Sequence, residues 1–154
     1  MAHEAFEQKM HQLVDLFQGD MDGFLTAFSP IHVTWHARRG AVVGGALLPI
    51  GFLTFHHTAV VAYKRMLRSI NQRMPPPFAP GYNSAIEGVG DPARFSREVE
   101  DWHNSVHNSD MRLMNPATNI FRPRFWGLHG FIDRNFVRWQ RVHRKITSSE
   151  HRTV

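Results

Sequence analysis

The sequence predicts an all-α protein, a helical bundle with a central four-helix core. Apolar side chains recur every three or four residues along five segments, which is the period of an amphipathic helix. No segment alternates apolar and polar residues clearly enough to predict a strand. Two of the helical segments carry pairs of histidines four residues apart, a spacing that places both on one helix face. At 154 residues the chain is long enough for one core, so we expect a single helical domain over residues 1–154.

Two helices are expected before the first apolar loop. The first covers about residues 4–18, where Gly19 provides a stop. The second is predicted to begin at Ser29-Pro30, a capping residue followed by a proline in the first helical position, and to end at Gly40.

A third helix is predicted after Pro49, with an apolar stripe that continues to Ile70. Residues 40–63 contain no charged residue when histidine is neutral, and they are long enough to span a bilayer. Glycines and a proline interrupt the first half of this stretch, and His56 with His57 would be costly inside a membrane. We therefore expect an apolar loop followed by a buried helix, and no membrane as a partner.

The second half of the chain is predicted to contain a long loop and two further helices. Residues 73–92 are rich in proline and glycine and are expected to pack over the body of the protein rather than to link domains. Asp91-Pro92 opens a fourth helix, and Pro123 opens a fifth that extends to about Lys145.

Composition limits the classes of function. The 18 Lys+Arg against 13 Asp+Glu give a formal charge of +5, and much of the excess lies between Arg134 and Lys145. No nucleic-acid motif accompanies this charge, so we interpret it as a solvated helix face and expect no nucleic acid as a partner. The absence of cysteine excludes disulfides, thiolate metal sites and cysteine nucleophiles. The first residues lack the apolar centre of a secretory signal, and a cytoplasmic protein is expected.

Histidine spacing carries the strongest functional signal among the eleven histidines. Six of them form two sets, each an HxxxH pair on one predicted helix followed by a third histidine about twenty residues later on the next. These sets are His32, His36 and His56, and His103, His107 and His129. Each pair can reach one metal ion, and the third imidazole completes a three-nitrogen site. A single HxxxH is as easily a chance pattern or a satisfied buried pair, but its repetition favours two metals facing each other in the bundle core.

The ligand set favours copper. Six neutral imidazoles suit copper, although zinc, iron and nickel also accept imidazole ligands. A carboxylate-bridged di-iron site needs Glu-x-x-His on two helices, and only Glu100 with His103 has that spacing. A hydrolytic zinc site usually brings the glutamate of H-E-x-x-H, which the sequence lacks. We therefore expect two copper ions as cofactors.

The sequence around these histidines resembles a known family, the type 3 copper proteins, which comprise tyrosinases, catechol oxidases and haemocyanins. Residues 123–133, PRFWGLHGFID, are similar to the family's second-site pattern D-P-x-F-aromatic-x-x-H-x-x-x-D, with Arg122 in place of the first aspartate. Residues 103–107, HNSVH, resemble the preceding H-N-x-x-H. The first half looks closest to the arthropod haemocyanin first site, and Leu47 stands where tyrosinases have a further histidine before His56.

The resemblance covers about residues 30 to 140 and implies a role for each matching residue. The first set of three histidines would hold one copper and the second set the other. Asn104 would act in catalysis by positioning a water that helps to deprotonate a phenol. The glutamate that accompanies this asparagine in tyrosinases lies further upstream than Glu98 or Glu100, which speaks against monophenol hydroxylation. Asp133 is expected to orient a ligand imidazole or support its helix, and His57 to lie outside the ligand set.

The resemblance implies a copper-dependent phenol or catechol oxidase that uses dioxygen to convert phenols, catechols or aminophenols to quinone-type products, with monooxygenase activity on phenols as an extension. Alternatives are a haemocyanin-like dioxygen carrier, an oxidase of a non-phenolic biosynthetic substrate, and a non-catalytic module whose histidines store metal. Access of organic molecules separates a carrier from an oxidase, and the sequence does not show whether residues 73–92 cover the metals. The expected partners are dioxygen, a small aromatic substrate, a copper chaperone and, because the bundle is short, a second copy of the chain.

Overall fold

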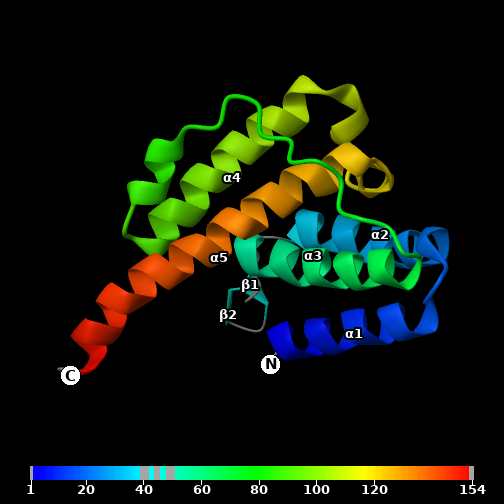
Figure 1. Ribbon diagram of the computed structural model, residues 1–154, viewed down its shortest axis with the longest axis horizontal. Coiled ribbons are helices and arrows are strands. Elements are labelled where there is room, and N and C mark those ends of the chain that lie inside the picture. Colours follow the sequence, from blue (N-terminus) through cyan, green and yellow to red (C-terminus); the bar gives the residue numbers. More distant parts are fainter. Residues whose placement is uncertain (1, 39–41, 44–45, 48–50, 153–154) are drawn as a thin grey trace.

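A computed structural model describes residues 2–38, 42–43, 46–47 and 51–152. The predicted all-α class is confirmed, with five helices arranged as a bundle (Figure 1). The elements are α1 (Ala2–Leu16), α2 (Met21–Arg38), β1 (Val42–Val43), β2 (Ala46–Leu47), α3 (Phe52–Ser69), η1 (Ser84–Gly88), α4 (Pro92–Ser109), η2 (Met111–Leu113), η3 (Asn119–Phe121) and α5 (Pro123–Arg152).

Helix α3 lies at the centre of the bundle and contacts each of the other four helices. Its apolar side chains recur along the whole helix, so that residues such as Phe55, Val60 and Met66 are fully buried. Helices α2, α3, α4 and α5 carry all the paired and partner histidines, and they form the predicted four-helix core. Helix α1 packs against α3 and α2.

Helix α2 begins eight residues earlier than predicted, at Met21 rather than at Ser29-Pro30. The Asp20 side chain accepts a hydrogen bond from the Gly23 backbone N–H at 2.9 Å and so caps the earlier start. Pro30 therefore lies inside the helix, where it cannot donate to the preceding turn. The additional turns bury Phe24 and Phe28, and this burial outweighs the local signal of the proline.

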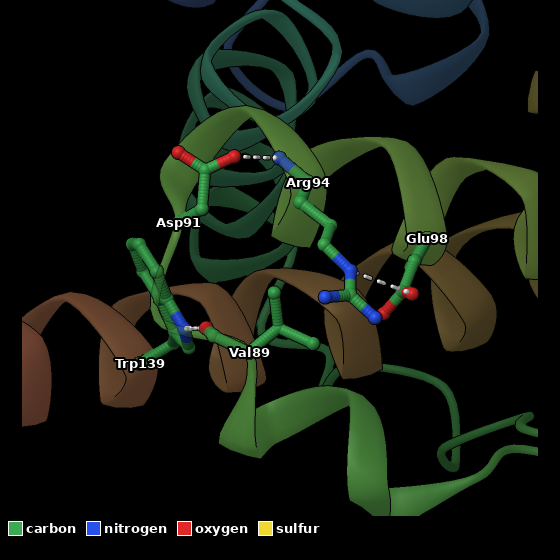
Figure 2. A network of polar contacts seen from close by, with 5 residues as sticks. All are labelled: Val89, Asp91, Arg94, Glu98 and Trp139. Atoms are coloured by element: carbon green, nitrogen blue, oxygen red, sulfur yellow. Dashed lines mark hydrogen bonds and ion pairs between the residues drawn. The ribbon is translucent and has the colours of Figure 1, made fainter.

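The other helix boundaries follow the predicted signals more closely. Gly19 adopts a left-handed φ of 82° after α1, as its role as a stop requires. At the start of α4, the Asp91 carboxylate accepts from the Arg94 N–H at 3.0 Å (Figure 2). Helix α5 continues past the predicted end at Lys145 to Arg152, because no glycine or proline interrupts it. The predicted end of the second helix at Gly40 lies outside the described residues, and α3 begins at Phe52, after Pro49 as predicted.

Two short strands of two residues each precede α3, and the sequence did not predict these strands. Strands β1 and β2 pair antiparallel, with Val42 opposite Leu47 and Val43 opposite Ala46. Two residues per strand are too few for an alternating pattern to be recognised. Each of the described helices is too short or too polar to traverse a bilayer.

The segment of residues 73–92 packs over α4 and α5, as predicted (Figure 1). The Phe78 N–H donates to the Gly127 carbonyl at 3.2 Å, and the Trp102 indole N–H donates to the Pro80 carbonyl at 2.9 Å. At its far end the Trp139 indole N–H donates to the Val89 carbonyl at 2.7 Å (Figure 2). These contacts hold the segment along its length.

Candidate metal centre

Four helices bring the six predicted histidines together as two triads. Within each triad, one ring nitrogen from every histidine lies within 4.8 Å of the others. The first triad takes two imidazoles from α2 and one from α3, and the second takes two from α4 and one from α5. Their members are His32, His36 and His56, and His103, His107 and His129. Each HxxxH pair shares a helix face because of its four-residue spacing.

Backbone carbonyls hold two of the three imidazoles of the first triad. His32 Nε2 lies 3.0 Å from His36 Nε2, and His32 Nδ1 donates to the Pro116 carbonyl at 2.8 Å. His56 Nδ1 donates to the Phe52 carbonyl at 2.8 Å, one turn earlier on α3. His32 and His56 are buried, so their orientation is fixed by the core.

The second triad converges on one nitrogen of α5. His129 Nε2 lies 3.1 Å from His103 Nε2 and 3.4 Å from His107 Nε2. His107 Nδ1 donates to the Leu113 carbonyl at 2.6 Å. His103 Nδ1 lies 3.0 Å from the Asn104 side-chain oxygen, which accepts its proton.

These hydrogen bonds decide which nitrogens can bind a metal. A carbonyl oxygen can only accept, so the Nδ1 atoms of His32, His56 and His107 must carry the proton. Their Nε2 atoms therefore present lone pairs to the interior of each triad, which is the arrangement that metal-ligating histidines usually show.

The donor set fits a metal ion. His56 Nε2 is buried and has no hydrogen-bond partner among the described residues. In the second triad, His103 and His107 both direct lone pairs at His129 Nε2, whose single proton could satisfy only one of them. A cation bound by each set of nitrogens would satisfy all of these lone pairs.

Burial keeps four of the six imidazoles neutral, as metal binding requires. Desolvation, with a contribution from His36, lowers the pKa of His32 to about 3. Desolvation also lowers the pKa values of His56 and His129 far below the usual range, and it lowers the pKa of His107. No carboxylate joins either group of nitrogens among the described residues.

The two triads lie next to each other in an apolar setting. The His56 and His129 rings, one from each triad, stack with centroids 4.3 Å apart and an interplanar angle of 16°. Phe52 contacts both His56 and His103, with ring centroids 4.8 and 4.6 Å away. Phe125 lies 4.2 Å from the His129 ring centroid. The arrangement suits two ions at a fixed separation in a dry interior.

A pocket of about 210 Å³ opens beside the triads. Its walls include the imidazoles of His36, His103 and His107, and the remaining lining residues are Asn104, Asn108, Leu113, Met114, Pro116 and Asn119. Met114 is 53% exposed, so the pocket reaches the surface. Four of its lining residues come from the segment of residues 113–119, whereas none comes from residues 73–92. The sequence left open whether residues 73–92 cover the metals, and these residues do not line this opening.

Two roles were expected for Asp133, orienting a ligand imidazole or supporting its helix, and its contact fits the second because it joins α5 to α3. Its Oδ1 accepts from His57 Nδ1 at 2.6 Å, and this contact raises the pKa of His57. His57 belongs to neither triad. Asp133, one turn after His129 on α5, therefore bonds to α3 and does not orient a candidate metal ligand.

Sequence reasoning missed the groups that hold the imidazoles. The carbonyls of Phe52, Leu113 and Pro116 accept from His56, His107 and His32, and the Asn119 side chain donates to the Leu113 carbonyl. Every residue has a carbonyl, so no pattern of residue types could have identified these three carbonyls.

Comparison with known proteins agrees with the second half of this site. Residues 79–142 match the common central domain of tyrosinase. This range contains all three histidines of the second triad and none of the first. The predicted resemblance to type 3 copper proteins is therefore confirmed over these residues. No curated protein and no solved structure matched the chain.

Proposed function

We propose that this protein is a binuclear copper oxidase acting on small phenols, catechols or aminophenols, because residues 79–142 match the common central domain of tyrosinase. The observation that carries the proposal is the pairing of two histidine triads beside a pocket that reaches the surface. The products would be quinone-type compounds, and dioxygen would be the oxidant.

Each triad would hold one copper ion through its Nε2 atoms. Bound copper would supply electron transfer and dioxygen binding, while the protein supplies orientation and a shaped environment. The carbonyls of Phe52, Leu113 and Pro116 would keep the imidazoles in the tautomer that presents Nε2. Phe52 and Phe125 would exclude water from the space between the triads.

Asn104 would act on the substrate from the pocket wall. It lines the pocket, and its side-chain oxygen accepts from His103 Nδ1. This bond leaves the amide N–H groups available to orient a water that helps to deprotonate the phenol, whose proton then passes to the solvent at the mouth of the pocket. The neutral amides of Asn108 and Asn119 in the same pocket would suit an uncharged, single-ring substrate.

The pocket favours an oxidase over a dioxygen carrier. A carrier must keep organic molecules away from its metals, whereas Asn104 and Asn108 are exposed residues that line a route from the surface to His103 and His107. The volume of about 210 Å³ is below the range of about 300–1,000 Å³ that is typical of pockets for drug-sized ligands, which suits a substrate of one aromatic ring.

The test is to measure copper atoms per chain by elemental analysis and then oxygen consumption with catechols and aminophenols. Two copper atoms are expected, with copper lost from the second triad in His129→Ala. The matched control is His11→Ala, which removes an exposed histidine of α1 outside both triads. Two copper atoms with bound dioxygen but no turnover would identify a carrier instead. Uptake of zinc or iron in place of copper would contradict the proposal.

A further inference from the structure

One short segment of chain touches both triads. Leu113 accepts from His107 Nδ1 through its carbonyl, and Pro116, three residues later, accepts from His32 Nδ1. These imidazoles come from different triads and from different helices, α4 and α2. The segment of residues 113–119 therefore fixes one candidate ligand of each site.

Asn119 holds the Leu113 carbonyl, which is the part of this segment that contacts the second triad. Its side chain is 3% exposed, and its Nδ2 donates to the Leu113 carbonyl at 3.1 Å. The same oxygen receives the His107 proton at 2.6 Å. Because a carbonyl must be met by a donor, the amide orientation of Asn119 is unambiguous. The backbone N–H of Asn119 is itself bonded to the Asn115 carbonyl at 2.8 Å.

The part of the segment next to Pro116 is bonded to α2. Ser29 Oγ donates to the Ala117 carbonyl at 2.7 Å, next to the Pro116 carbonyl that holds His32. The Asn115 side chain accepts from the Ala117 N–H at 2.9 Å, which closes the turn between the two ends. Hydrogen bonds therefore connect the Leu113 carbonyl through Asn119 and Asn115 to Ala117, the residue next to Pro116.

We propose that Asn119 is a positioning residue for the metal centre and that residues 113–119 couple the two triads mechanically. Asn119 fixes the Leu113 carbonyl, the carbonyl fixes the His107 tautomer, and the closed turn carries the constraint to His32. The inference rests on the proposed function for its meaning, because the positioned imidazoles are candidate copper ligands. Partners that orient ligand histidines typically change metal affinity by about 10- to 100-fold when they are removed.

The test compares Asn119→Ala with Asn135→Ala. Asn135 is a matched control because it is also buried, at 6% exposure, and its Nδ2 also donates to a backbone carbonyl, that of Phe131, at 3.1 Å. It lies on α5 outside both triads. The first measurement is the tautomeric state of His107 and His32 in the metal-free full chain, read from the nitrogen chemical shifts of the imidazoles by NMR. The second is copper(I) affinity at each triad, by competition with a chromophoric chelator.

In Asn119→Ala we expect the pure Nδ1–H form of His107 to give way to a mixture of tautomers, with a smaller change at His32. We expect copper(I) affinity of the second triad to fall by about 10- to 100-fold. Asn135→Ala should lower only the stability of the protein and leave the imidazole tautomers and the copper(I) affinity at the wild-type values. A change at His107 with none at His32 would overturn the coupling but support the positioning.

Unchanged tautomers in Asn119→Ala, or equal changes in both variants, would overturn the inference. This result is distinguishable from failure of the proposed function. If the wild-type chain bound no copper, the proposed function would fail, and the tautomer measurement on the metal-free chain would still decide whether Asn119 positions His107.

Discussion

At the residue scale, the candidate site depends on which nitrogen of each imidazole carries its proton. Three imidazoles donate from Nδ1 to backbone carbonyls and so present Nε2 inward, and the Asn104 amide does the same for His103. Adjacent histidines on α3 differ completely in this respect. His56 directs a buried nitrogen into the first triad, whereas His57 is partly exposed and bonds to Asp133.

Replacement of His57 by alanine should separate these two roles. The change leaves the buried Asp133 carboxylate without its partner, so the free energy of unfolding should fall by about 1–2 kcal/mol. The 40% exposure of His57 limits the loss. Urea denaturation measures the stability, and elemental analysis should show unchanged copper per chain. Loss of copper in His57→Ala, as in His56→Ala, would show that His57 is a ligand.

At the element scale, the start of α5 and the 73–92 segment depend on each other. A Cβ atom built on Gly127 would lie 2.3 Å from the Pro76 carbonyl oxygen. The segment can therefore approach α5 closely only where the helix has no side chain. Gly127 is also two residues before His129, so the same turn supports the segment on one side and the second triad on the other.

Gly127→Ala should move residues 76–78 away from α5. The clash is with backbone rather than with a flexible side chain, and we expect the free energy of unfolding to fall by about 1–3 kcal/mol. Gly88→Ala is the matched control, because an added Cβ there meets nothing within 4 Å. Both are measured by urea denaturation. Equal stabilities would mean that the close approach to Pro76 is not required.

At the scale of the whole molecule, the bundle keeps neutral imidazoles buried at its centre, and this has a cost in acid. His32, His56 and His129 all have pKa values far below those they would have in the unfolded chain. Below about pH 6.5 the unfolded chain takes up protons that the native state does not. These three imidazoles therefore make the free energy of unfolding fall as the pH falls.

The metal-free protein should lose about 1 kcal/mol of stability for each such imidazole between pH 6.5 and 5.5. For His32 the loss should continue down to its native pKa of about 3. Urea denaturation at several pH values measures this slope. His32→Leu should show a shallower dependence than the wild type, and parallel profiles would contradict the assignment of His32 as a buried neutral group.

Copper should stabilise the entire bundle, because the triads join four helices. Binding to the native state alone adds about 4 kcal/mol at a free metal concentration one thousand times the dissociation constant. We expect the melting temperature to rise on copper loading, to return to its starting value with a chelator, and to rise less in His129→Ala. A melting temperature independent of copper would mean that copper does not bind the native bundle in preference to the unfolded chain.

The sequence by itself determined the helical class, four of the five helix starts and the grouping of the six histidines. These features depend on short-range rules, namely the helical period, capping residues and the four-residue spacing of HxxxH. The predicted start of α2 at Ser29-Pro30 was wrong, because burial of Phe24 and Phe28 against other helices outweighs this local signal.

Only the tertiary structure decided how the imidazoles are oriented and where the pocket opens. The partner of Asp133 proved to be His57, which is 76 residues away in the chain. Leu113, Pro116 and Asn119 act on His107 and His32 through backbone carbonyls and one amide. Such groups have no signature in a sequence, because a carbonyl occurs at every position and acquires a role only when folding brings a donor to it.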